Sequence, residues 1–272
     1  MPAEARDPDA YAHGHHPSVL RSHGWRTATN SAGYLLPHLR PGDRLLDVGI
    51  GPGTITLDFA RRLTGGWVTG IDSAEPAVVA TAQLAASEGV TNLTAETGNV
   101  YALTYADDSF DVAHAHQVLQ HLSDPVAALV EMRRVVRPGG LVAARDADYA
   151  AMTWYPADLR LDRWLDLYHR VARAVGGEPD AARRMRHWAL QAGFTEVTCT
   201  ATAWCFADAD DVAWWSQTWA ERMVSSAFAT QAVEAGADRA ELEELSAGFR
   251  WWGEQPDAWF AVLHGELLAV QR

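Results

Sequence analysis

The sequence predicts an α/β fold built on a doubly wound, mostly parallel sheet, and three observations lead to this class. Short apolar runs alternate with segments of helical spacing between residues 44 and 147. The runs are bounded by glycine, proline or polar residues, as buried parallel strands usually are. One segment of helical spacing separates most consecutive runs, which implies right-handed crossovers between parallel neighbours.

The first half of the predicted sheet is read from alternating strands and helices. Residues 44–49 and 67–72 are apolar runs that predict buried strands, and 54–63 between them has helical spacing. Residues 75–89 predict a helix, with proline near its start and glycine at its end. Residues 92–99 predict a weaker third strand.

The second half repeats the pattern with stronger boundaries. Residues 110–118 predict a fourth strand, and 123–136 predict a helix capped by Ser123 or Asp124. An RPGG sequence ends that helix, and residues 141–147 predict a fifth strand. Ligands of such sheets bind at the carboxyl ends of the strands.

Beyond the fifth strand the alternation stops. Residues 149–193 and 208–250 predict helices, whereas 196–206 and 259–270 predict strands. The expected sheet therefore has seven strands, mostly parallel with an antiparallel last strand. Residues 1–40 are expected to form helices or a lid ahead of the sheet.

The composition excludes several classes of function. The 272 residues include 22 arginines, no lysine and 35 acidic residues, for a formal net charge of -13. A nucleic-acid partner would require a basic face, so we expect none. No apolar run is long enough for a membrane span, and no signal peptide is recognisable, so we expect a cytoplasmic protein. Cys199 and Cys205 indicate neither a disulfide framework nor a zinc site.

The stretch LLDVGIGPGT, residues 45–54, carries the main functional signal. Glycine permits tight turns and close approach of a ligand to the main chain. The spacing of Gly49, Gly51 and Gly53 differs from the GxGxxG loop that holds a dinucleotide pyrophosphate. Together with Asp47, the stretch resembles motif I of class I S-adenosylmethionine-dependent methyltransferases.

Further segments in the same order resemble this family over residues 42–147. Asp72 ends the second predicted strand, where a carboxylate can accept hydrogen bonds from both ribose hydroxyls. The resemblance implies contacts to adenine after the third strand and to the methionine half of the cofactor after the fourth. The implied set that binds S-adenosyl-L-methionine is Asp47, Gly49, Gly51, Gly53, Asp72, Ser73, Asn99, Val100, His116 and Gln117. Arg26 is a further candidate, expected to pair with the carboxylate of the cofactor, and a surface arginine is the alternative.

The chain also resembles the small-molecule branch that includes ubiquinone and menaquinone biosynthesis C-methyltransferases and bacterial secondary-metabolite methyltransferases. The resemblance implies a Rossmann-like sheet, with residues 1–40 as lid helices and 41–272 as the methyltransferase domain. Within that domain we expect a cofactor core at 42–147. Helical cap segments are expected at about 149–193 and 208–250.

Candidate catalytic residues come from the histidine-rich N-terminal arm. Methyl transfer releases a proton, and histidine titrates near neutral pH. Tyr11, His15 and His16 are the candidates, and a solvated arm with no catalytic part is the alternative. The arm lacks a clear carboxylate or cysteine partner, so we expect no metal.

The expected acceptor is an apolar or aromatic small molecule. Twelve tryptophans, several of them between residues 204 and 259, can line an aromatic pocket as well as a core. We expect methylation at carbon of an indole- or quinone-like acceptor in secondary metabolism, with O- or N-methylation as the alternative. An NAD-dependent oxidoreductase and a non-catalytic cofactor-binding module are the alternatives of another class. A homo-oligomer is compatible with the sequence.

Overall fold

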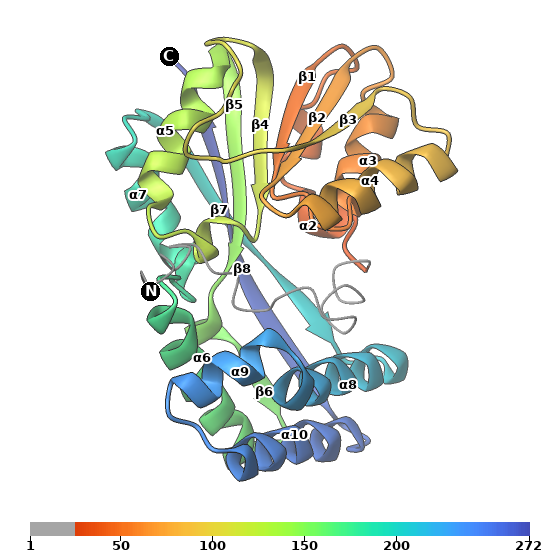
Figure 1. Cartoon of the computed structure of the whole chain (residues 1–272), viewed down its shortest axis with the longest axis vertical. Helices are drawn as coiled ribbons and strands as arrows, with labels where there is room; N and C mark the ends of the chain where they lie inside the picture. The colour runs from red at the N-terminus through yellow and green to blue at the C-terminus, as the bar shows by residue number, and fades with distance from the viewer. Residues whose placement is uncertain (1–24) are drawn as a thin grey trace, which may run out of the picture.

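The computed structural model describes residues 25–272. Its central element is an eight-stranded sheet with the order β3-β2-β1-β4-β5-β8-β6, and β7 pairs with β8 (Figure 1). Strands β1 to β5 pair in parallel, whereas β8 is antiparallel to β5, β6 and β7. The strands are β1 Arg44–Val48, β2 Trp67–Asp72, β3 Leu93–Thr97, β4 Phe110–His116, β5 Val136–Ala147, β6 Thr153–Tyr155, β7 Glu196–Phe206 and β8 Trp259–Val270.

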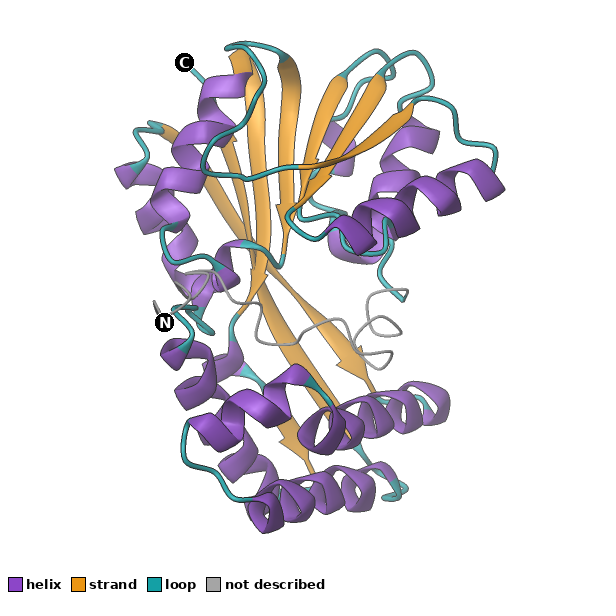
Figure 2. Cartoon of the chain, in the orientation of Figure 1, coloured by secondary structure: helices purple, strands orange, loops and turns teal. Residues whose placement is uncertain are grey.

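Helices cover both faces of the parallel part of the sheet (Figure 2). One hydrophobic core packs α5 and α7 against one face, and a second packs α2 and α3 against the opposite face. No helix within residues 25–272 is long and apolar enough to cross a membrane. The α-helices are α2 Ala28–Ser31, α3 Thr54–Arg62, α4 Glu75–Ser87, α5 Pro125–Val135, α6 Leu159–Ala174, α7 Met185–Gln191, α8 Ala209–Ser225, α9 Ala227–Glu234 and α10 Arg239–Gly253.

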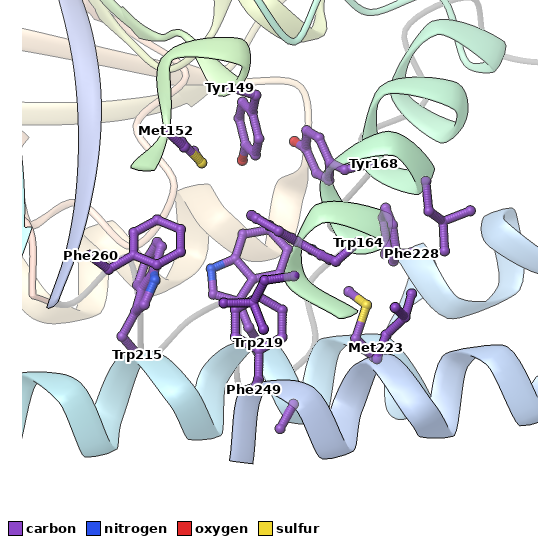
Figure 3. Close-up of a cluster of buried hydrophobic side chains, with 14 of the residues drawn as sticks. Tyr149, Met152, Trp164, Tyr168, Trp215, Trp219, Met223, Phe228, Phe249 and Phe260 are labelled. Atoms are coloured by element: carbon purple, nitrogen blue, oxygen red, sulfur yellow. The ribbon is translucent and has the colours of Figure 1, made fainter. Parts of the chain in front are cut away.

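Strands β7 and β8 extend past the parallel strands and carry the helical cap (Figure 1). The pairing of β8 with β5 ends where His264 lies opposite Ala147, and beyond that point β8 pairs with β6. Helices α6, α8, α9 and α10 pack around this extension. Their aromatic side chains form a third core, in which Trp164 and Trp219 are fully buried (Figure 3).

The Rossmann-like, doubly wound class predicted from the sequence is confirmed, with one strand more than expected. The added strand is β6, three residues long, inside the segment 149–193 that was predicted to be helical. It is too short to show an alternating pattern, and it exists because the far half of β8 offers a pairing edge.

The ends of the helices and strands lie close to the capping and turn residues from which they were predicted. Helix α5 is capped by Asp124, whose side chain accepts a hydrogen bond from the Ala127 N–H. Gly89, with φ of +67°, follows α4 in the left-handed conformation that ends helices. Strand β5 begins at Val136, earlier than predicted, and its pairing with β4 shifts register across the RPGG residues.

Candidate active site

The glycine loop connects β1 to α3 at the carboxyl end of β1. Its three glycines have no side chains that could cover the main chain there. Gly49, Gly51 and Gly53 all have positive φ, at 72°, 52° and 82°. A Cβ on Gly49 would lie 2.4 Å from Val118 Cγ2, and one on Gly53 would lie 2.5 Å from Thr81 Oγ1. Only glycine fits both the conformation and the space. The loop therefore suits a ligand that contacts the main chain.

Asp47 lies beneath this loop and is 3% exposed. Its Oδ2 accepts a hydrogen bond from the Thr56 hydroxyl at 2.7 Å, and its Oδ1 is 2.7 Å from His114 Nδ1. Each carboxylate oxygen thus has a protein partner that fixes its direction. This arrangement orders the turn, and the predicted proximity of Asp47 to the ammonium of the cofactor stays a prediction.

Asp72 ends β2 and ties it to the glycine loop. Its Oδ2 accepts from the Gly51 N–H at 3.0 Å, and its Oδ1 accepts from the Ala74 N–H at 2.9 Å. A carboxylate offers about four acceptor positions, so lone pairs remain for ligand hydroxyls. The neighbouring Ser73 is exposed at the same strand end.

The residues after β3 are held by their own turn. Asn99 Oδ1 accepts from the Tyr101 N–H at 2.9 Å, whereas Val100 is 8% exposed and packs into the core beneath. Both lie next to the strand end, as the sequence predicts. In this structure Asn99 orders the turn.

His116 ends β4, and Gln117 follows it in a left-handed conformation with φ of 52°. A positive φ is uncommon outside glycine and marks strain that is often kept at functional sites. His116 is buried, and its two ring nitrogens have no hydrogen-bond partner within residues 25–272. Burial, with the charges of Arg26 and Arg145, holds the pKa of His116 well below its usual range.

Arg26 contacts Gln117 from the N-terminal segment. Its Nη2 donates to Gln117 Oε1 at 2.6 Å, and its guanidinium lies 5.5 Å from the centre of the Trp204 ring. The sequence predicts that Arg26 pairs with the cofactor's carboxylate. The structure places it beside the predicted cofactor residue Gln117, and the pairing itself stays a prediction.

A buried charged pair lies behind Gln117. Arg145 is 1% exposed and its Nε is 3.5 Å from Glu266 Oε1, while Glu266 also accepts hydrogen bonds from the hydroxyls of Thr200 and Thr202. Burial lowers the pKa of Arg145 to about 10. Sequence reasoning missed Glu266, although a glutamate inside the apolar run 259–270 is a usable signal.

Asp146 lies near the end of β5 and Asp148 directly follows the strand, and the two carboxyl groups have different partners. Asp146 Oδ1 accepts from the Gln120 N–H at 3.1 Å, and burial raises the pKa of this carboxyl to about 7. Asp148 forms a two-pronged ion pair with Arg183. Asp146 therefore ties β5 to the turn that follows β4, and Asp148 ties the end of β5 to the cap segment.

A small cavity with aromatic side chains in its lining lies beside Gln117 on the cap side. Arg222, 4% exposed, comes from α8, and its guanidinium lies 4.9 Å from the centre of the Trp219 ring. The tryptophan-rich segment predicts such a lining, but nothing in the local pattern singles out Arg222. The cavity is lined by Arg26, Gln117, Ala147, Tyr149, Met152, Trp204, Trp214, Trp215, Trp219, Arg222 and Val262.

The predicted catalytic residues Tyr11, His15 and His16 lie outside the described residues. Among the residues that the structure describes, the cavity lining contains neither a histidine nor a carboxylate.

The parallel sheet, the bare glycine loop and the strand-end carboxylate tied to it define a class I S-adenosylmethionine-dependent methyltransferase. The loop, Asp72 and the apolar Val100 fit a nucleoside with an amino acid tail. The family described as a methyltransferase domain matches residues 39–200, and the chain belongs to this family.

Two curated relatives differ in how much of the chain they match. An uncharacterised methyltransferase of Schizosaccharomyces pombe is 33% identical over 95% of this chain and 95% of its own length. The ubiquinone/menaquinone biosynthesis C-methyltransferase UbiE of Bdellovibrio bacteriovorus is 38% identical, but over only 38% of this chain and 43% of its own length. The membership predicted from the glycine loop is confirmed, and the quinone resemblance covers only part of the chain.

Solved structures share the fold at low identity. The YcgJ protein of Bacillus subtilis has a TM-score of 0.59 and 17% identity, covering 89% of this chain and 99% of that one. Phosphoethanolamine N-methyltransferase 2 of Haemonchus contortus, in complex with S-adenosyl-L-methionine, has a TM-score of 0.53 and 16% identity, covering 88% and 51%. The cofactor of this chain is S-adenosyl-L-methionine.

Proposed function

We propose that the protein methylates a carbon atom of an oxygen-bearing aromatic small molecule, in secondary metabolism. The observation that carries this is the lining of the small cavity beside Gln117, to which four tryptophans contribute. Indole rings supply flat apolar surface that suits an aromatic acceptor. When bound, S-adenosyl-L-methionine supplies an electrophilic methyl carbon.

The two guanidinium groups in the lining favour an oxygen substituent on the acceptor. Arg26 and Arg222 both line the cavity, and a guanidinium stabilises a phenolate or enolate oxygen. Ionisation of a ring hydroxyl raises electron density at neighbouring ring carbons, which makes carbon a nucleophile. Of the acceptors expected from the sequence, a quinone- or quinol-like ring agrees better with this lining than an indole.

The cofactor is proposed to lie along the carboxyl ends of β1 to β4. The loop would hold its amino acid end with Asp47 ordering the turn, and Asp72 would accept hydrogen bonds from the ribose. The remaining proposed contacts are Arg26, Ser73, Asn99, Val100, His116 and Gln117. Positioning of this kind can supply much of the rate of a displacement at carbon.

The base is proposed to come from residues 1–40, acting as a lid over the domain 41–272. The described lining has no imidazole or carboxylate, and Tyr11, His15 and His16 supply the missing chemistry. The cap segments at about 149–193 and 208–250 would enclose the acceptor against the cofactor core 42–147.

Two measurements test the proposal. Calorimetry with S-adenosylhomocysteine and with NAD is expected to show binding of the first alone, and binding of NAD alone would overturn the assignment. Methyl-labelled cofactor is then offered with naphthoquinols, phenols and indoles, and nuclear magnetic resonance locates the methyl group. We expect label on a ring carbon of a hydroxylated acceptor, and label on oxygen or nitrogen only would contradict carbon methylation.

A further inference from the structure

A histidine near the C-terminal end of the chain contacts the strained residue at the active site. Gln117 Nε2 lies 2.7 Å from His264 Nε2, across 147 positions of sequence. His264 is fully buried on β8, opposite Ala147, at the point where the sheet passes into the cap. His264 therefore lies between the proposed cofactor side of the site and the cavity on the cap side.

The hydrogen bonds of His264 determine which ring nitrogen carries the proton. Its Nδ1 lies 3.0 Å from the Val262 carbonyl oxygen, which can only accept, so Nδ1 holds the hydrogen. Nε2 is then an acceptor, and the Gln117 amide must donate to it. Gln117 Oε1 accepts from Arg26 on its other side. The orientation of the Gln117 amide follows from these two contacts.

The surroundings of His264 preserve this arrangement. The Trp204 ring lies 4.2 Å from the imidazole between ring centres, and the Arg145 guanidinium lies 4.9 Å from the centre of the Trp204 ring. Burial, together with the charge of Arg145, holds the pKa of His264 well below its usual range. A neutral imidazole keeps Nε2 available as an acceptor for Gln117.

We propose that His264 is a positioning residue, which holds the Gln117 amide in one orientation between the cofactor loop and the aromatic cavity. The inference rests on the proposed function, because Gln117 is the proposed contact to the methionine half of the cofactor. Preorganisation of this kind lowers the cost of ordering a side chain when a ligand binds.

The test measures the affinity for S-adenosylhomocysteine by calorimetry in wild type, His264→Leu, Gln117→Leu and the double variant. Each single variant is expected to weaken binding about tenfold, and the double variant by about the same factor, since one contact is lost only once. His264→Gln, which retains an acceptor, is expected to restore binding to within about threefold of wild type. Leu263→Ala, on the same strand, serves as the packing control and is expected to bind normally.

The outcomes separate this inference from the proposed function. Absence of binding by wild type would contradict the function itself. Normal wild-type binding with independent, multiplying effects of the two leucine variants would overturn the role of His264 alone. If His264→Leu does not fold, His264→Gln decides: additional weakening when it is combined with Gln117→Leu would contradict the proposal.

Discussion

The carboxylate of Asp72 holds the backbone N–H of Gly51, with 3.0 Å between Oδ2 and the amide nitrogen. This bond joins the end of β2 to the middle of the glycine loop. Because the second carboxylate oxygen accepts from Ala74, the side chain cannot rotate without losing one of the two bonds. The loop shape and the strand-end carboxylate are therefore one structural unit.

Asp72→Asn is expected to weaken S-adenosylhomocysteine binding at least about tenfold, because the amide group points a donor at one of two N–H donors. Asp72→Ala should bind S-adenosylhomocysteine no more than a few-fold more weakly than Asp72→Asn does. Calorimetry measures both, with Glu75→Gln as the control, since Glu75 is an exposed carboxylate in the first turn of α4. Wild-type affinity in Asp72→Asn would contradict the linkage.

Gly53→Ala is expected to abolish measurable cofactor binding and to lower the melting temperature. The added Cβ would meet Thr81 Oγ1 at 2.5 Å, in a backbone conformation that already disfavours side chains. Gly89→Ala is the matched control, because Gly89 also has positive φ but no atom near the added Cβ. That control should lose about 1 kcal/mol of stability and keep its affinity.

Trp214→Ala is expected to weaken binding of the aromatic probe 1-naphthol about tenfold, since one wall of the cavity loses its apolar surface. Affinity for S-adenosylhomocysteine should change less than about twofold, because Trp214 is not among the proposed cofactor contacts. Quenching of tryptophan fluorescence reports the probe. Trp251→Ala, on α10 and outside the cavity lining, is the control, and equal losses in both variants would argue against an aromatic site.

Asp146→Asn is expected to flatten the dependence of stability on pH. The folded-state pKa of about 7 lies above the ordinary aspartate value of 3.8, so between these pH values the folded protein binds one proton more than the unfolded protein. The stability that Asp146 contributes is full below about pH 4 and is lost as the pH rises through about 7. Urea unfolding at pH 5 and pH 8 measures this.

At pH 8 the Asp146→Asn variant should be the more stable protein, and at pH 5 its advantage should be smaller, because pH 5 lies between the two pKa values. Asp257→Asn, at an exposed position, should keep the wild-type profile. A variant that is equally destabilised at both pH values would show that Asp146 acts through its hydrogen bonds alone.

Local pattern predicted most of the core because the relevant interactions are local. The strand 67–72 and the helix 54–63 are set by apolar spacing, and the helix cap at Asp124 is set by its own side chain. The glycine loop was recognisable for the same reason, since positive φ at Gly49, Gly51 and Gly53 is a property of those residues.

The doubly wound class, the glycine loop with its strand-end carboxylate, and membership of the methyltransferase family could all be predicted from local residue patterns. By contrast, the pairing of β6 with β8, the place of Arg222 in the cavity lining and the contact between His264 and Gln117 became visible only in the folded chain. These contacts depend on the register of long strands and on helix packing across the cap. Such register is chosen by the summed burial of many distant residues, so no short stretch of sequence carries it.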